Sequence, residues 1–494
     1  MERKSPSIRL AACCGGGRGI GRIFIALEKG RGGRGGAMRQ TGRAAAEVRG
    51  RRPRGVRDVD RKRYKVIIVG GGPAGSLTAL WLLRLRPELA GDILLLEARG
   101  FPREKVCGGG VSGRVTAALQ ELGISLEGLP KVPVERFSVC FEREICRPSF
   151  GNDKCFVARR SGFDQLLLGL AAERGAEVRT RVPAKGAYRE RRGVVVLDGE
   201  GATHRAEVLV GADGVNGASR HWFGVPHRGR KSLLLQADFP RDPDSAVLRD
   251  CLMMDFSVSK YGIPGYAWFF PSIGDRGEPV VNAGISGGRF GKGGYADLRN
   301  AFFAVLRHHP EIEAMVPGDA RFKPYPEREY TPFQRVALER VLFVGEQVGV
   351  DPFTGEGLAV CADSAEVAAR EIARALDAGD FSFRGYARRL LAAPFFPLYF
   401  VGKTYCLQNN HLQPSFFFAM ATMDKPEERR NVVDHYAAVF SGSEDGRVLY
   451  SPGFWSMAVR DMAATFPGWL RKMGGLPALF RRRCGAASPA PGAG

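Results

Sequence analysis

A cysteine stands beside three consecutive glycines in the segment KVCGGGVS, residues 105–112. A thiol in this setting can be a metal ligand, a nucleophile or a disulfide partner, and bare backbone can form a floor for a flat ligand. The chain has ten cysteines but no C-x-x-C pair, and the spacing of Cys140, Cys146 and Cys155 matches no zinc or iron–sulfur pattern. We therefore expect no metal site, and we interpret Cys107 as a compact wall residue beside a ligand, with an acid or a nucleophile as the alternative.

The segment GGGPAG, residues 70–75, has the surroundings of a dinucleotide-binding loop. It follows YKVIIV (64–69), a short apolar run rich in β-branched residues, and it precedes apolar residues at helical spacing. DILLLE (92–97) is a second apolar run, and it ends in an acid. This order predicts a buried strand, a glycine loop, a helix and a second strand, which together bind a dinucleotide.

Each part of this unit has a physical task. Gly70 allows a tight turn, Gly72 lets the backbone approach a pyrophosphate, and Gly75 permits close packing of the helix on the strand. The helix N-terminus favours the phosphate charge, and Glu97 can accept a hydrogen bond from a ribose hydroxyl. The unit by itself does not distinguish FAD from a nicotinamide nucleotide.

Three later segments favour FAD, because a simple NAD-binding domain lacks them. RRSGFDQLL (159–167) opens a helix that we expect to end near Gly175, and AEVLVGADGVNGASR (206–220) is a strand that runs into Asp-Gly. RVLFVGEQVGVDPFTGEGL (340–358) is another buried strand, followed by a loop broken by glycines and a helix that Gly379 ends.

Over roughly residues 64–385 the chain resembles the FAD-dependent group that includes p-hydroxybenzoate hydroxylase and the geranylgeranyl reductases. The resemblance rests on the segments above, on the C-G-G loop at 107–109, and on YAWFFP (266–271), which matches Y-x-W-x-F-P. It implies that the first glycine unit binds the ADP half of FAD and that the Asp-Gly segment serves the pyrophosphate. It also implies that the helix start after D-P-F-T-G-E-G (351–357) lies under the flavin ring, where amides stabilise the anionic reduced flavin.

Residue by residue, the resemblance implies a set of cofactor contacts. Arg160 and Asp164 match an R-x-x-F-D segment near the flavin chain, and Arg103 faces the flavin or the pyrophosphate. The residues expected to bind FAD are Gly70, Gly72, Pro73, Ala74, Gly75, Glu97, Ala98, Arg99, Arg103, Cys107, Gly108, Gly109, Arg160, Ala184, Asp213, Gly214, Gly345, Glu346, Pro352, Gly355, Gly357 and Leu358.

The chain departs from the pattern of this group at two places. Gly345-Glu346 stands where the group has Gly-Asp at the ribitol, and the loop to Asp351 is one residue short. We expect FAD to bind with a shifted backbone, and weakened flavin binding is the alternative. NAGIS (282–286) puts Ser286 in place of the second glycine of a G-x-G segment. Only one complete glycine unit follows residue 64, so we expect NAD(P)H to dock transiently beside the flavin.

Three aromatic residues alternate in the segment GYAWFFP (265–271). On a strand, Tyr266, Trp268 and Phe270 share one face, which suits the wall of a flat apolar cavity for an isoprenoid or quinone-like substrate, or plain sheet core. Flavin halogenases have W-x-W-x-I-P and a catalytic lysine instead, so Tyr266 and the C-G-G loop argue against that activity. We expect Cys107, Tyr266 and Trp268 to be catalytic, and Tyr266, Cys107 or a water to supply a proton.

Residues 1–63 differ in composition from the rest of the chain. They hold 18 Lys and Arg against 5 Asp and Glu, so about 13 of the net charge of +21 lies there, among many glycines. This composition predicts a disordered, solvated arm, although CCGGGRGIGR (13–22) resembles the glycine loop of short-chain dehydrogenases. We expect no signal peptide, and no apolar run reaches the ~18 residues of a membrane span.

The expected fold class is α/β: a Rossmann-type FAD-binding domain interleaved with a mixed β-sheet substrate domain, plus a mostly helical C-terminal region. The expected segments are a basic arm at 1–63, FAD-binding parts at 64–125, 156–225 and 331–385, substrate-domain parts at 126–155 and 226–330, a C-terminal cap at 386–480 and a flexible tail at 481–494.

These observations predict a FAD-dependent, NAD(P)H-driven reductase of carbon–carbon double bonds in a hydrophobic substrate. An aromatic monooxygenase is the alternative, because the same FAD motifs serve it, and a non-enzymatic polyanion-binding protein is the second alternative. The expected partner is a hydrophobic small molecule and no specific nucleic acid, while the oligomeric state stays open. We expect a cytoplasmic location, with peripheral contact to the inner face of the membrane through the apolar residues 386–425 as a further hypothesis.

Overall fold

The computed structural model describes residues 62–394, with gaps at 148, 151–153, 244–245, 247, 264, 290–293, 332–333 and 352–353, and then residues 396, 432–454 and 456. The predictions for the basic arm, the flexible tail and most of the C-terminal cap fall outside these residues, and so does Pro352.

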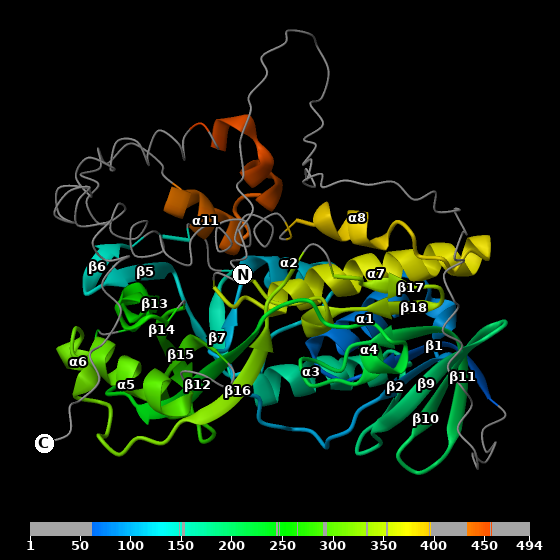
Figure 1. Ribbon diagram of the computed structural model, residues 1–494, viewed down its shortest axis with the longest axis horizontal. Coiled ribbons are helices and arrows are strands. Elements are labelled where there is room, and N and C mark those ends of the chain that lie inside the picture. The colour runs from blue at the N-terminus through cyan, green and yellow to red at the C-terminus, as the bar shows by residue number, and fades with distance from the viewer. Residues whose placement is uncertain are drawn as a thin grey trace, which may run out of the picture. The chain divides into compact units, whose positions relative to one another are not determined.

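An eight-stranded sheet carries the glycine unit (Figure 1). Five of its strands run parallel in the order β8, β2, β1, β11, β18, and β17, β10 and β9 extend it in antiparallel fashion. This is the doubly wound pattern, in which ligands bind at the carboxyl ends of the strands. The strands are β1 Arg63–Val69, β2 Ile93–Leu96, β8 Glu177–Arg179, β9 Ala184–Glu190, β10 Gly193–Asp198, β11 Thr203–Gly211, β17 Ala337–Leu338 and β18 Val341–Phe343.

Helix α1 (Pro73–Leu85) packs against both α7 (Leu358–Ala378) and α3 (Arg160–Glu173). Its apolar residues are buried almost all round, as expected for a helix enclosed between a sheet and its neighbours. The predicted helix end at Gly379 is confirmed, because this residue caps α7 with a positive φ of 70°. The nucleotide-binding part also contains η1 Pro87–Leu89, α2 Gly113–Glu121, α4 Ser219–Trp222, η3 Gly345–Gln347 and α8 Tyr386–Leu391.

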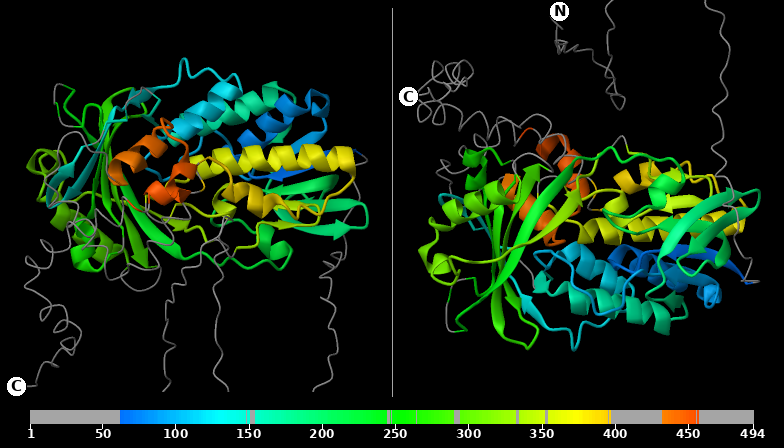
Figure 2. Two further views of the ribbon diagram at one scale, coloured as in Figure 1. Left: turned by 90° about the horizontal axis from the view of Figure 1, so that it is seen from above. Right: turned by 60° about the horizontal axis from the view of Figure 1, so that its bottom comes forward.

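A second sheet, of seven strands, lies beside the nucleotide-binding part, in the order β16, β12, β15, β14, β13, β5, β6 (Figures 1 and 2). A smaller sheet has the order β3, β7, β4. The strands are β3 Gly110–Val111, β4 Lys131–Pro133, β5 Arg136–Phe141, β6 Arg143–Cys146, β7 Phe156–Ala158, β12 Lys231–Pro240, β13 Cys251–Asp255, β14 Ala267–Ile273, β15 Pro279–Arg289 and β16 Lys323–Arg328, and the helices are η2 Phe256–Tyr261, α5 Tyr295–Leu306 and α6 Pro310–Glu313.

The predicted alternation of the aromatic strand is confirmed. Ala267 and Phe269 of β14 belong to the core under α5, whereas Tyr266, Trp268 and Phe270 belong to the larger core on the other side. The strand therefore presents three aromatic rings toward the nucleotide-binding part of the molecule.

The described part of the C-terminal region comprises α11 (Val432–Phe440) and η4 (Gly446–Tyr450). Phe440 stacks on Phe150 with ring centroids 5.7 Å apart, and residues from α11 join the large core. The expected α/β fold class, with a Rossmann-type domain and a second, mixed sheet, is confirmed. No helix among the described residues is long and apolar enough to cross a membrane.

Candidate active site

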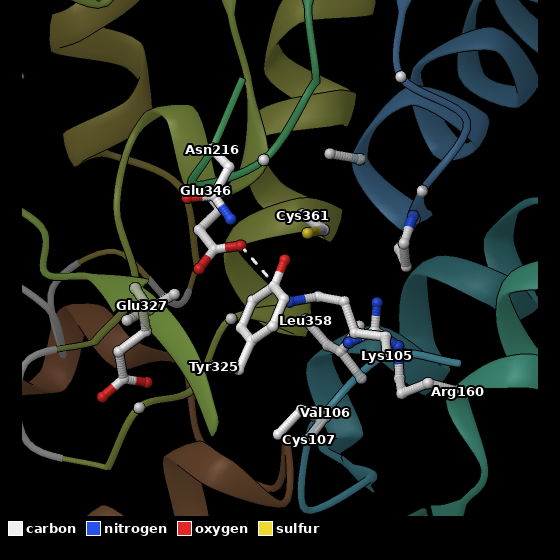
Figure 3. Close-up of a pocket in the computed structure, with 18 of the residues that line it drawn as sticks. Lys105, Val106, Cys107, Arg160, Asn216, Tyr325, Glu327, Glu346, Leu358 and Cys361 are labelled. Atoms are coloured by element: carbon white, nitrogen blue, oxygen red, sulfur yellow. Dashed lines mark ion pairs between the residues drawn. The ribbon is translucent and has the colours of Figure 1, made fainter. Parts of the chain in front are cut away.

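A cavity of about 520 Å³ opens where the glycine loop, the cysteine loop, the aromatic strand and the start of α7 meet (Figure 3). Among the predicted site residues that the structure describes, all but Gly75 and Gly345 line this cavity. They are Gly70, Gly72, Pro73, Ala74, Glu97, Ala98, Arg99, Arg103, Cys107, Gly108, Gly109, Arg160, Ala184, Asp213, Gly214, Tyr266, Trp268, Glu346, Gly355, Gly357 and Leu358.

The two exceptions lie behind the wall of the cavity. A Cβ on Gly75 would be 1.9 Å from the carbonyl oxygen of Gly70, so this glycine serves the close packing of α1 on β1. Gly345 has a φ of +60°, and a Cβ there would be 2.5 Å from that of Ala74. Both residues shape the site without facing its interior.

The glycine loop has the geometry of an anion cradle. Gly70 turns the chain with a φ of +108°, and the amide of Gly71 donates to Glu97 Oε2 at 2.7 Å. The α1 N-terminus has Gly72 as its N-cap, no capping side chain and no acidic residue in its first turn. The free amides and the positive dipole at this helix end suit a phosphate group. The residues present therefore fit the pyrophosphate of FAD.

Two arginines share one buried carboxylate next to this loop. Arg160 binds both oxygens of Asp164, at 2.7 and 3.0 Å, and Arg103 Nη2 lies 3.2 Å from Asp164 Oδ2. Burial opposes the charge of Arg160, but Asp164 more than offsets this, so the pKa of Arg160 is raised. Arg103 also lies 3.2 Å from the position of a Cβ on Gly72. The cluster keeps a net positive charge where the pyrophosphate is expected.

Neighbouring groups hold the Asp213 carboxylate in place at the wall of the cavity. Its carboxylate accepts from Ser219 N at 2.8 Å and from Gln347 Nε2 at 2.8 Å, and the same Gln347 amide donates to Gly214 O at 2.7 Å. Burial raises the pKa of Asp213. Asp213 therefore joins the loop after β11 to η3, and the backbone of Gly214 completes that side of the cavity.

The cysteine loop lies against the aromatic strand. A Cβ on Gly108 would be 2.8 Å from the ring of Phe270, and Gly109 has a φ of +77°, so glycine is needed at both positions. Cys107 lines the cavity as a free thiol whose Sγ accepts from Gly109 N at 3.4 Å. Within the residues that the structure describes, no cluster of His, Cys, Asp or Glu is suited to a metal ion.

The start of α7 supplies another polar part of the cavity wall. Glu356 Oε1 accepts from Ala359 N at 2.7 Å, so this carboxylate, one residue before the N-cap Gly357, pairs an amide in the first turn of α7. Burial raises the pKa of Glu356 to about 7. Tyr266 Oη donates to the carbonyl of Thr354, and burial holds the pKa of Tyr266 well above its usual value. The aromatic strand is thus tied directly to the loop that precedes α7.

Sequence reasoning missed several polar residues of the cavity. Lys105 Nζ lies 3.6 Å from Glu346 Oε2 and 4.0 Å from the centroid of the Tyr325 ring, and Figure 3 shows the two charged groups pointing toward each other. Burial disfavours the charge of Lys105, but Glu346, Tyr325 and Cys107 together outweigh it, so the pKa of Lys105 is raised. Glu327 and Ser286 also line the cavity. Lys105 stands in the quoted cysteine segment, whereas no local pattern marks Glu327.

Comparisons with known proteins agree with this geometry. A family model described as FAD binding domain matches residues 63–250. A digeranylgeranylglycerophospholipid reductase of Methanocella arvoryzae is 32% identical, over 66% of this chain and 81% of the relative. A menaquinone reductase of Mycobacterium tuberculosis is 30% identical, over 44% of this chain and 54% of the relative. The crystal structure of a geranylgeranyl bacteriochlorophyll reductase-like protein from Thermoplasma acidophilum has a TM-score of 0.60 at 21% identity, covering 84% of this chain and 99% of that one, and supports the fold.

Proposed function

Because the chain belongs to the geranylgeranyl reductase family of FAD-dependent oxidoreductases, we propose that it reduces carbon–carbon double bonds of an isoprenoid or quinone-like substrate, with NAD(P)H as the electron donor. The observation that carries this proposal is that the glycine loop and the aromatic strand line one continuous cavity. When bound, FAD supplies the hydride for such a reduction.

One half of the cavity suits the nucleotide. Gly72 and the uncapped N-terminus of α1 would hold the pyrophosphate, with Arg103 as its counter-charge. Glu97 is held in place by the amides of Gly71 and Arg99, both at 2.7 Å, and would accept from a ribose hydroxyl. These groups orient the cofactor without taking part in the chemistry.

The other half suits an apolar chain or a flat ring. Besides the three aromatic residues of the β14 face, Leu234, Leu252, Met254 and Phe440 line it. Such a wall binds an isoprenoid or a quinone mainly by burying its apolar surface, which is worth roughly 25 cal/mol per Å². It would also exclude water from the reacting carbons.

The experiment is an anaerobic half-reaction with purified protein. The flavin is bleached with NADH or NADPH, and digeranylgeranylglycerophospholipid or menaquinone is then added in detergent. Return of the flavin colour together with a product whose isoprenoid chain, rather than a quinone ring, has gained two hydrogens supports the proposal. Return of the colour only after oxygen is admitted, with oxygen incorporated into a product, would instead indicate a monooxygenase. A colourless protein that takes up no added FAD contradicts both.

A further inference from the structure

Glu327 is an acidic residue of the cavity that none of the motifs includes. It lies in β16, at the edge of the seven-stranded sheet, and its side chain lines the cavity (Figure 3). A Cβ placed on Gly355 would be 3.4 Å from Glu327 Oε2 and 3.3 Å from Tyr266 Oη. The carboxyl and the phenol therefore converge on the loop that leads into α7, beside the aromatic wall.

Among the described residues, Glu327 has a hydrogen-bond donor but no cation within ion-pair distance. Ser286 Oγ donates to Glu327 Oε1 at 2.6 Å. Lys105 is instead held by Glu346 and by the ring of Tyr325. Across the described part of the chain, no Lys, Arg or His forms an ion pair of 4.0 Å or less with Glu327.

These surroundings favour the protonated carboxyl. Burial raises the pKa of Glu327 to about 7; the hydrogen bond from Ser286 opposes this shift, repulsion from Glu346 and Glu329 adds to it, and the charge of Lys105 opposes it. A general acid is most effective when its pKa lies near the working pH, because both its protonated and its deprotonated forms are then accessible.

Tyr266 is less suited to lose a proton. Its hydroxyl already donates to Thr354 O, and burial together with the charges of Glu327, Asp351 and Glu356 disfavours the phenolate. Loss of its proton would leave a buried anion beside other acids, which is costly. Loss of a proton from Glu327 leaves a carboxylate that Ser286 stabilises.

We propose that Glu327 donates the proton that completes reduction of the substrate double bond, and that Ser286 is its positioning residue; this inference rests on the reductase function proposed above. One alkene carbon receives a hydride whose two electrons come from NAD(P)H. The other carbon forms a C–H bond with the proton of Glu327 as the carboxyl O–H bond breaks. The carboxylate then regains a proton from water that reaches it through the cavity.

The test uses the full-length, FAD-loaded protein and the variant Glu327→Gln, which keeps the shape of the side chain. The rate at which NAD(P)H bleaches the flavin and the rate at which digeranylgeranylglycerophospholipid restores its colour are measured separately under anaerobic conditions. We expect the second rate to fall about 10²-fold or more, and Glu327→Asp to retain part of it. In the wild type this rate should fall as the pH rises through about 7, and in Glu327→Gln that dependence should disappear.

A second measurement does not depend on turnover. Infrared titration of the carboxyl C=O bands should show that Glu327→Gln lacks one of the bands that lose a proton near pH 7 in the wild type, whereas the band of Glu356 remains. Because the Ser286 hydrogen bond favours the charged form, Ser286→Ala should move this titration to higher pH.

The outcomes separate the two proposals. If Glu327→Gln restores the flavin colour at the wild-type rate and pH dependence, or if the band titrates at the ordinary pH of a glutamate, Glu327 is not the proton donor and the reductase function stands. If neither the lipid nor menaquinone reoxidises the wild-type flavin, the reductase function fails and the proton role fails with it.

Discussion

The indole Nε1 of Trp268 donates a hydrogen bond to Asn282 Oδ1 at 2.8 Å. The amide nitrogen of Asn282 donates in turn to Cys107 O at 3.2 Å and to Asp238 Oδ1 at 2.9 Å. The Asn282 side chain therefore ties the aromatic strand to the neighbouring cysteine loop.

Asn282→Ala should destabilise the protein by about 2 kcal/mol, because it leaves the Trp268 indole and the Cys107 carbonyl without these partners. Urea denaturation measures the change in the free energy of unfolding. Asn300→Ala, at an exposed position of α5, is the matched control and should change it by less than about 0.5 kcal/mol. Equal effects of the two substitutions would show that Asn282 is not the clamp described here.

Gly72→Ala should weaken FAD binding at least tenfold, which corresponds to about 1.4 kcal/mol. Gly72 has a φ of −71°, and the nearest atom to an added Cβ is Arg103 Nη2 at 3.2 Å, so the methyl group strains little but occupies the anion cradle. Flavin fluorescence measures the affinity. Gly169→Ala, whose Cβ would meet nothing within 4 Å, should leave it unchanged, whereas Gly75→Ala should prevent folding.

Glu356→Gln should stabilise the flavin-free protein at pH 8 by about 4 kcal/mol at most. The pKa of Glu356 is raised by burial to about 7 in the folded protein, against about 4.3 in an unfolded chain. The contribution of Glu356 to the free energy of unfolding is thus fully present below about pH 4 and is lost as the pH rises through 7. Glutamine keeps an oxygen that accepts from the Ala359 amide. Because glutamine does not ionise, the variant does not lose stability as the pH rises.

Unfolding curves of Glu356→Gln and the wild type, recorded from pH 4 to pH 8, check this sign. The exposed Glu121→Gln serves as the control and should follow the wild-type curve. A variant that is less stable than the wild type at pH 8 would mean that the charged carboxylate, as a helix cap, outweighs its burial.

Lys105 and Glu346 should shift the pKa of Glu327 in opposite directions. Lys105→Met removes a charge that lowers the pKa of Glu327 and leaves Glu346 without this partner, so the Glu327 titration should move above pH 7. Glu346→Gln removes a charge that raises it, so the titration should move below pH 7. Infrared titration measures both pKa shifts. Shifts of the same sign in the two variants would contradict the placement of Lys105 and Glu346 beside Glu327.

Much of the nucleotide half could be predicted from local sequence. GGGPAG lies between a buried strand and a helix, and the structure has β1 and α1 at these places. The alternation in GYAWFFP likewise placed Tyr266, Trp268 and Phe270 on one face, which is the face toward the cavity. The departures at Glu346 and Ser286 were visible, but their partners, Lys105 and Glu327, were not.

The sequence by itself determined which segments become strands, loops and helices around a dinucleotide, because strand period, helix period and the backbone freedom of glycine act between near neighbours. Only the tertiary structure decided which side chains meet inside the cavity. The contacts of Lys105 with Glu346, of Asn282 with Cys107 and of Ser286 with Glu327 join elements far apart along the chain. Such contacts depend on the order of strands in two sheets and on how the loops between the strands pack. The spacing of residues along the chain predicts neither.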